Sequence, residues 1–329
     1  MQSAAGVQRR RSPPSSDEVH EDSFSDPSST AEDADTDLSS VSTEAHSPPA
    51  PKPAGEATPK RSVHGLLQSA WSTLVALGDM TMNMTQGAVV RALSVGPMPS
   101  HIAFIMDGNR RWSREHGSHV QHGHQMGFQA LKRVLELCMS LERVHTVTVY
   151  AFAIDNFKRD PSEVAALMDL ARSRLLELMG HGEVVSRHSI RIRVVGHRSL
   201  LPRDVQAAVE RIEEATKYNT RGVLNICMPY SARDEMSQAA NACVHEGTAL
   251  TQQAFEKHLM VTDDVPVDLL VRTSRVSRLS DFLLWQCNES TQLHFVDRYW
   301  PQFGLWDFVP ILLAYQRDRI TGMLAGESA

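Results

Sequence analysis

Short apolar runs rich in β-branched residues alternate along the chain with longer stretches in which apolar residues recur at helical spacing. Such alternation is typical of a single α/β domain whose mainly parallel sheet is surrounded by helices, and we expect this domain over residues 96–329. The short runs predict six strands, at 102–106, 146–153, 190–195, 223–228, 267–271 and 293–296. Helical spacing predicts helices at 125–141, 161–179, 203–217, 232–246, 252–259 and 305–320.

Residues 62–95 form a separate amphipathic segment ahead of this domain. Six apolar residues recur at roughly helical spacing within it: Leu66, Leu67, Trp71, Leu74, Val75 and Leu77. The segment is too short and too often interrupted to span a bilayer. Two interpretations stay open. The helix lies in a membrane interface, with Trp71 at the boundary, or it packs on the domain or on a partner.

The first 61 residues differ in composition from the rest of the chain. Residues 1–60 hold 11 acidic and 5 basic residues and eight of the 16 prolines, whereas the remaining 269 residues hold 28 of each charge. Because the tail has almost no large apolar residues to bury, we expect it to be disordered. Its Ser-Pro sites, such as Ser12 and Ser47, suit phosphorylation, and an inert solvated tail is the alternative. The neutral body argues against nucleic acid as a partner, since phosphate backbones require a basic face.

Other features narrow the class of protein further. The chain has no run of 18 apolar residues for a membrane span and no apolar signal-peptide core at its start. Its four cysteines stand far apart, which disfavours a zinc site or a disulfide framework and suits a reducing compartment. These features predict a protein that is neither secreted nor integral to a membrane.

Three predicted strands end in clusters of polar and basic residues. The first is followed by the sequence 107–112 (DGNRRW), the second by 155–159 (DNFKR), and the fifth by 272–281, which contains three arginines. Arginines suit phosphate oxygens, and an aspartate among them makes sense if it holds Mg²⁺ together with a substrate phosphate. Capping and surface ion pairs would explain any one cluster. Three clusters at the carboxyl ends of parallel strands favour one shared anion site.

The motifs at these strand ends resemble the cis-prenyltransferase family of undecaprenyl and dehydrodolichyl diphosphate synthases. The matching segments follow the family's order: 101–112 (HIAFIMDGNRRW), Gly123-His124, 149–170, 224–235, 272–286 and Tyr299-Trp300-Pro301. The resemblance covers about residues 96–316 and is greatest to the eukaryotic dehydrodolichyl type, especially the fungal one. It implies a Mg²⁺-dependent enzyme that adds isopentenyl diphosphate in cis to farnesyl diphosphate. The long polyprenyl diphosphate would serve dolichol synthesis and protein glycosylation.

The resemblance also implies roles for individual residues. Asp107 would be catalytic and hold the metal, and Asn109 and Asn156 would lie beside the reacting ends of the substrates. The residues implied in substrate binding are Gly108, Arg110, Arg111, Trp112, His124, Arg159, Arg272, Ser274, Arg278 and Ser280. The apolar residues of 126–139 and 164–179 would line a tunnel for the growing chain or simply form core.

Several positions depart from the family pattern. Arg275 stands where the family usually has glycine, and Val120 where relatives usually have an arginine. Ala153 and Asp155 replace the usual Ser and Glu. An arginine at position 275 would strain the loop, block substrate or add a phosphate contact. A non-catalytic or impaired stabilising subunit of the same fold is therefore the alternative to a catalytic one.

The C-terminus bears on the partner. Single-subunit relatives end in an Arg-x-Gly motif, and here Arg319 and Gly322 are one residue too far apart to match it. The resemblance thus implies a heteromer with a Nogo-B-receptor-like subunit, whose interface uses the C-terminal half of the body, and a homodimer is the second choice. It also implies a peripheral location at the cytosolic face of the endoplasmic reticulum membrane.

Overall fold

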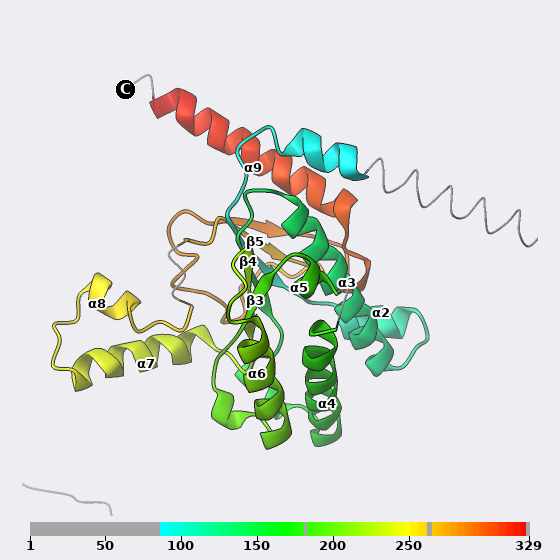
Figure 1. Cartoon of the computed structure of the whole chain (residues 1–329), viewed down its shortest axis with the longest axis vertical. Coiled ribbons are helices and arrows are strands. Elements are labelled where there is room, and N and C mark those ends of the chain that lie inside the picture. The colour runs from blue at the N-terminus through cyan, green and yellow to red at the C-terminus, as the bar shows by residue number, and fades with distance from the viewer. Residues whose placement is uncertain (1–85, 181–182, 262–264, 327–329) are drawn as a thin grey trace, which may run out of the picture. The chain divides into compact units, whose positions relative to one another are not determined.

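Figure 1 presents the computed structural model, which describes residues 86–180, 183–261 and 265–326. The predicted disordered tail, residues 1–61, and most of the amphipathic segment lie outside the described residues. Both remain predictions.

The domain is built on one six-stranded sheet in which all paired strands are parallel, with the order β3-β4-β2-β1-β5-β6. The strands are β1 (His101–Ile105), β2 (Thr146–Tyr150), β3 (Ile190–Val195), β4 (Gly222–Cys227), β5 (Leu269–Arg272) and β6 (Gln292–Phe295). The predicted α/β class and all six predicted strands are confirmed. Every residue of β1 is buried, whereas the edge strand β6 alternates between exposed and half-buried positions. A central strand is covered on both faces, which explains why its sequence is a continuous apolar run.

Helices surround the sheet (Figure 1), and the six helices predicted from the sequence periodicity are all present. They are α2 (Asn109–Glu115), α3 (Val120–Ser140), α4 (Pro161–Leu178), α5 (Val184–Arg187), α6 (Arg203–Thr216), α7 (Ala232–His245), α8 (Gln252–Glu256) and α9 (Leu305–Gly326). Short 3₁₀ turns add η1 (Ile154–Lys158), η2 (Arg198–Leu200) and η3 (Trp300–Gln302). Asp160 caps α4 by accepting a hydrogen bond from the Ser162 amide at 2.8 Å. The sequence did not predict α2 and α5, because both helices are too short to show the helical spacing of apolar residues.

The alternation of side chains along β1 divides the interior into two cores. Ile102 and Phe104 point into the larger core, which contains side chains of α3, α4, α6 and α9. Ala103 and Ile105 point into a second core, which they share with Phe282 among others. Successive residues of a strand face opposite sides of its sheet, so one strand joins both cores. This holds the carboxyl end of β1 in a fixed place.

The end of the amphipathic segment packs on the domain. Residues 86–93 are helical, and Val90 and Leu93 are buried in the larger core. The Gln316 side chain, on α9, donates a hydrogen bond to the Leu93 carbonyl at 2.6 Å. Figure 1 draws this helix beside α9. Among the helices of the described residues, none is long and apolar enough to cross a bilayer.

A fully buried carboxyl group ties α7 to the rest of the second core. Glu235 accepts hydrogen bonds from the backbone amides of Met260 at 2.7 Å and Val261 at 3.0 Å. It also accepts from the Tyr230 hydroxyl and from the Gln286 side chain at 3.1 Å. Since these donors are shielded from water, they depend on this one carboxyl group.

We expect Glu235→Ala to lower the free energy of unfolding by about 3 kcal/mol, because it leaves several buried donors without an acceptor. Urea unfolding followed by circular dichroism measures the effect. The matched control is Glu142→Ala, at an exposed position, which should change little. Equal stabilities of the two variants would contradict the role of Glu235.

Candidate active site

The carboxyl ends of the central strands open into a cavity of about 940 Å³. Ligands of open parallel sheets bind at this edge, beyond the strand ends. Most of the predicted site residues line it: Asp107, Gly108, Asn109, Arg110, Arg111, His124, Asn156, Arg159, Arg272, Arg278 and Ser280. Segments far apart in the sequence therefore meet in one cavity, in which arginines outnumber the three lining carboxylates, Asp107, Asp155 and Asp281.

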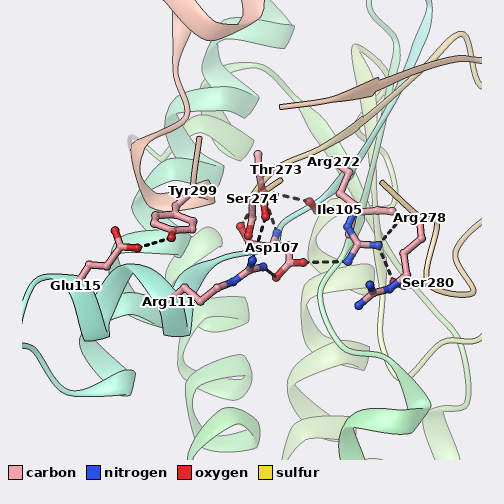
Figure 2. A network of polar contacts seen from close by, with 10 residues as sticks. All are labelled: Ile105, Asp107, Arg111, Glu115, Arg272, Thr273, Ser274, Arg278, Ser280 and Tyr299. Atoms are coloured by element: carbon pink, nitrogen blue, oxygen red, sulfur yellow. Dashed lines mark hydrogen bonds and ion pairs between the residues drawn. The ribbon is translucent and has the colours of Figure 1, made fainter. Parts of the chain in front are cut away.

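Asp107 lies at the centre of a polar network, which Figure 2 shows. One carboxylate oxygen accepts a hydrogen bond from Arg272 Nη2 at 2.9 Å, and the other lies 3.2 Å from Arg111 Nη2. The Arg272 side chain is only 4% exposed, whereas that of Asp107 is 31% exposed. The backbone amide of Asp107 donates to the Thr273 hydroxyl at 3.0 Å. The carboxylate is thus held by two cations and still faces the cavity.

Gly108 makes the turn from β1 into α2 possible. Its φ is +105°, in the range that favours glycine. A Cβ at this position would lie 2.7 Å from Tyr299 Cδ1 and 3.1 Å from the Ser274 side chain. Any larger residue would therefore have to displace the Tyr299 ring and press on the Ser274 side chain.

The loop after β5 gathers a second basic cluster. Arg272 Nη1 donates to Ser280 Oγ at 2.6 Å and to the Arg278 carbonyl, and Arg278 Nε donates to Ser280 Oγ at 3.2 Å (Figure 2). Ser280 and Asp281 both have positive φ angles, of 51° and 63°. Arg272 contacts both Asp107 and this cluster, so one guanidinium joins the two halves of the cavity.

Several residues of the cavity wall were not among the predicted site residues. Asp281 accepts hydrogen bonds from the Ser231 hydroxyl and, at 2.9 Å, from the Arg233 amide. Its carboxylate thereby anchors the 272–283 loop to the start of α7. All three residues line the cavity, as does Tyr150. The acidic and basic residues of 231–235 and 281 were visible in the sequence, but their separation in the chain gave no sign that they meet.

The wall formed by α3 and α4 is also charged. Arg159 Nη1 contacts Glu163 at 3.0 Å, and Arg110 Nη1 contacts the same oxygen at 3.6 Å. His124 Nε2 is buried and has no hydrogen-bond partner among the described residues. Burial, and then the positive charge of Arg159, lower the pKa of His124 to about 4. His124 is therefore neutral at physiological pH.

Asn156, Trp112 and Ser274 make local contacts. The Asn156 side-chain oxygen accepts from the Ala153 amide at 3.2 Å, which stabilises η1. The Trp112 ring stacks on His116, with ring centroids 4.3 Å apart. Ser274 is buried, and its carbonyl accepts from Arg111 Nη1 at 3.0 Å. Neither Trp112 nor Ser274 is among the residues that line the cavity.

Of the departures from the family pattern, Ala153 and Asp155 line the cavity, whereas Arg275 and Val120 do not. Arg275 has a φ of +58°, its side chain is 75% exposed, and its Nε lies 3.5 Å from Asp297. It is not among the cavity-lining residues. Val120 begins α3, and Asp155 forms an exposed ion pair with Lys158 at 2.7 Å. The side chain of Arg275 thus leaves the cavity open.

A smaller apolar pocket of about 150 Å³ adjoins the basic cavity and shares His124, Phe152 and Leu167 with it. Its other apolar side chains come mainly from α3 and α4: Phe128, Leu131, Leu170, Ala171, Leu175 and Leu178. Part of the predicted tunnel stripes therefore does face a pocket. The rest of those helices, such as Val134 and Leu135, is fully packed core.

Similarity to known proteins agrees with this arrangement. Residues 105–322 match the family model described as "Putative undecaprenyl diphosphate synthase". A dehydrodolichyl diphosphate synthase complex subunit of Schizosaccharomyces pombe is 42% identical over 243 residues, which cover 72% of this chain and 92% of that protein. The human dehydrodolichyl diphosphate synthase complex subunit is 41% identical over 233 residues, 69% of each chain.

A solved structure extends the similarity to the fold. Lavandulyl diphosphate synthase from Lavandula x intermedia, in complex with dimethylallyl diphosphate, superposes with a TM-score of 0.60 at 31% identity. The match covers 67% of this chain and 95% of that one. The chain therefore belongs to the cis-prenyltransferase family of undecaprenyl and dehydrodolichyl diphosphate synthases, which are transferases of prenyl groups. Elongation of a polyprenyl chain is the type of reaction that this membership supports.

The lowered pKa of His124 predicts a specific acid sensitivity. Between about pH 6.5 and 4 the unfolded chain protonates this histidine and the folded one does not, so stability falls as the pH falls. When the pH is lowered from 7 to 4, we expect the unfolding free energy of wild type to fall by about 3 kcal/mol more than that of His124→Asn. Urea unfolding at both pH values measures it. The exposed His145→Asn serves as control, and the same acid loss in wild type and His124→Asn would contradict the assignment.

Proposed function

We propose that this chain is the catalytic subunit of a dehydrodolichyl diphosphate synthase. It adds isopentenyl diphosphate units in cis to farnesyl diphosphate and makes a long polyprenyl diphosphate for dolichol synthesis and protein glycosylation. The observation that carries the proposal is the contact between Asp107 and Arg272, at 2.9 Å. It brings the two predicted diphosphate-binding clusters into one cavity.

The two clusters suit the two substrates. The turn 107–111 would bind the allylic diphosphate, and Arg272, Arg278 and Ser280 the isopentenyl diphosphate. Holding both in one cavity aligns the reacting carbon atoms and replaces an improbable encounter in water. As the allylic diphosphate leaves, negative charge builds on its oxygens, and the arginines beside it stabilise that charge. His124 is neutral, and its Nε2, which has no hydrogen-bond partner among the described residues, could donate or accept one hydrogen bond there.

Asp107 is the residue that would hold Mg²⁺. Its carboxylate is partly exposed to the cavity, and the described residues contain no group of three metal-binding side chains. This fits Mg²⁺ sites that use one or two carboxylates together with substrate phosphates. When bound, the ion would neutralise part of the charge of the leaving diphosphate. Arg111 and Arg272, which each contact a different oxygen of Asp107, would keep the carboxylate oriented for the ion.

The apolar pocket between α3 and α4 would receive the growing hydrocarbon chain. It adjoins the basic cavity at His124 and Leu167, so the diphosphate and the hydrocarbon of one substrate can occupy the two environments at once. A pocket of about 150 Å³ holds only a short prenyl chain, and longer products require α3 and α4 to part or the chain to emerge between them.

A non-catalytic or impaired stabilising subunit is the alternative. Arg275 and Val120 favour it, since both depart from the family pattern. The retained cluster of Asp107, Arg111 and Arg272 favours the catalytic role, because a site that has lost its function has no need of a buried arginine at its centre.

We further propose that the chain works in a heteromer with a Nogo-B-receptor-like subunit, through the C-terminal half of its body. Two relatives are named as complex subunits. Arg319, the residue nearest to the family's terminal motif, contacts Asp268 of its own chain at 3.0 Å. The proposal also places the chain at the cytosolic face of the endoplasmic reticulum. Because the end of the segment 62–95 packs on the domain, only its earlier part, residues 62–85, would face membrane or partner. The tail, residues 1–61, would have no catalytic role.

Incorporation of radiolabelled isopentenyl diphosphate tests the function. Purified protein is given farnesyl diphosphate, Mg²⁺ and detergent, with and without the Nogo-B-receptor-like partner. Incorporation only with the partner supports the proposal, and incorporation by the chain alone would replace the heteromer by a homodimer. A folded complex that incorporates nothing would favour the non-catalytic alternative.

In the same assay, we expect Asp107→Asn to lower turnover by about 100-fold or more, because the amide cannot supply the negative charge that the site uses. The isosteric side chain still accepts a hydrogen bond from Arg272, so the fold should be kept. Asp169→Asn, at an exposed position of α4, is the matched control. Turnover of Asp107→Asn near that of wild type would refute the proposed metal role.

Arg275→Gly should keep turnover within about twofold of wild type, since the side chain lies outside the cavity and its exposed ion pair contributes little. Arg278→Ala, which alters the cavity wall, should lower turnover by about 100-fold under the same conditions. A large loss in Arg275→Gly would mean that Arg275 itself contacts substrate.

A further inference from the structure

Tyr299 lies against the turn that carries Asp107. Its backbone position is fixed because the following amide, of Trp300, donates to the Asp107 carbonyl at 3.0 Å. Its ring packs on Gly108, where even a Cβ would lie 2.7 Å from Cδ1. The ring face lies 5.8 Å from Arg111 Cζ, at the distance of a cation–π contact. The ring thus contacts the glycine and the arginine of the same turn.

The hydroxyl of Tyr299 donates a hydrogen bond to the Glu115 carboxylate (Figure 2). Arg111 and Glu115 are four residues apart in α2, so they share one face of the helix and both meet Tyr299. This hydrogen bond raises the pKa of Tyr299 above its ordinary value, because the bond to the Glu115 carboxylate favours the protonated hydroxyl. The contact fixes the rotation of the ring.

Arg111 is the residue that needs such support. Its side chain is 42% exposed, and within the described part of the chain it contacts Asp107, the Ser274 carbonyl and the Tyr299 ring. A long, half-exposed side chain loses much conformational entropy when it is held in one place. When a diphosphate binds, Arg111 must share its donors between the new oxygens and these partners. The ring is the one contact that uses none of its N–H groups.

We propose that Tyr299 and Glu115 form a positioning pair for Arg111, which keeps the guanidinium poised for the allylic diphosphate. Tyr299 touches no reacting atom and acts through Arg111. The inference rests on the proposed function in one respect, namely that the 107–111 turn binds the allylic rather than the isopentenyl diphosphate.

The test compares Tyr299→Phe, Glu115→Gln and the double variant in the reconstituted enzyme. Tyr299→Phe keeps the ring and removes only the hydrogen bond. We expect each single variant to raise KM for farnesyl diphosphate by about two- to fivefold, the effect of losing one modest hydrogen bond. KM for isopentenyl diphosphate and kcat should stay unchanged. The double variant should be no worse than the worse single variant, because the two side chains form one contact.

Tyr218→Phe is the matched control, since Tyr218 is 84% exposed, precedes the amino end of β4 and is not among the residues that line the cavity beyond the carboxyl ends of the strands. Equal shifts in both KM values, no shift in either, or additive effects in the double variant would each overturn the inference. Urea unfolding should give the same midpoint for Tyr299→Phe and wild type, and a lowered midpoint with unchanged KM values would indicate a structural role only.

A binding measurement separates this inference from the proposed function. Titration calorimetry with a non-reacting thio analogue of farnesyl diphosphate gives the affinity of the wild-type complex and of Tyr299→Phe without any turnover. Affinity reduced about two- to fivefold in the variant supports the positioning pair even if wild type shows no incorporation. Equal affinities would overturn the pair even if wild type is fully active.

Discussion

The site depends on one buried guanidinium. Arg272 ends β5 and pairs in register with Ile105 at the end of β1, so Asp107, two residues further, is within reach of its side chain. A cation that is almost fully buried must be satisfied, and Arg272 finds its partners on both sides, in Asp107 and in the loop that carries Ser280. Because the buried guanidinium finds acceptors on both sides, the parallel pairing of two neighbouring strands fixes the geometry of both halves of the cavity.

The loops around the Arg272–Asp107 contact adopt costly backbone conformations, which their hydrogen bonds maintain. Ser274, Ser280 and Asp281 all have positive φ angles, which residues with a Cβ rarely adopt. Each is held by hydrogen bonds that a relaxed loop would lose: the Ser274 amide to Arg298, Ser280 to Arg272, and Asp281 to the start of α7. The fold thus maintains a strained, basic rim at the strand ends. At Gly108 the backbone comes too close to the Tyr299 ring for any side chain to fit.

The basic cavity and the apolar pocket lie side by side because different elements at the same edge of the sheet form them. The arginines project from the turns after β1 and β5, whereas the apolar pocket opens between α3 and α4 on the side of the larger core. An amphiphilic substrate, with a charged head and a hydrocarbon tail, matches this division. His124 stands at the boundary between the two, and its lowered pKa reflects both the burial and the positive charge nearby.

The sequence by itself determined the sheet, the principal helices and the grouping of Asp107, Arg111, Arg272 and Ser280 at strand ends, because hydrophobic periodicity reports burial and parallel strands bring their carboxyl ends together. Short helices such as α2 are too short to show a helical spacing of apolar residues, so the sequence did not predict them. Only the tertiary structure decided where side chains point: Arg275 points outward to Asp297, Ser274 turns its carbonyl to Arg111, and Glu115 meets Tyr299 across 184 positions of sequence. Such contacts follow from the packing of distant loops, and local residue patterns hold no information about which loops will meet.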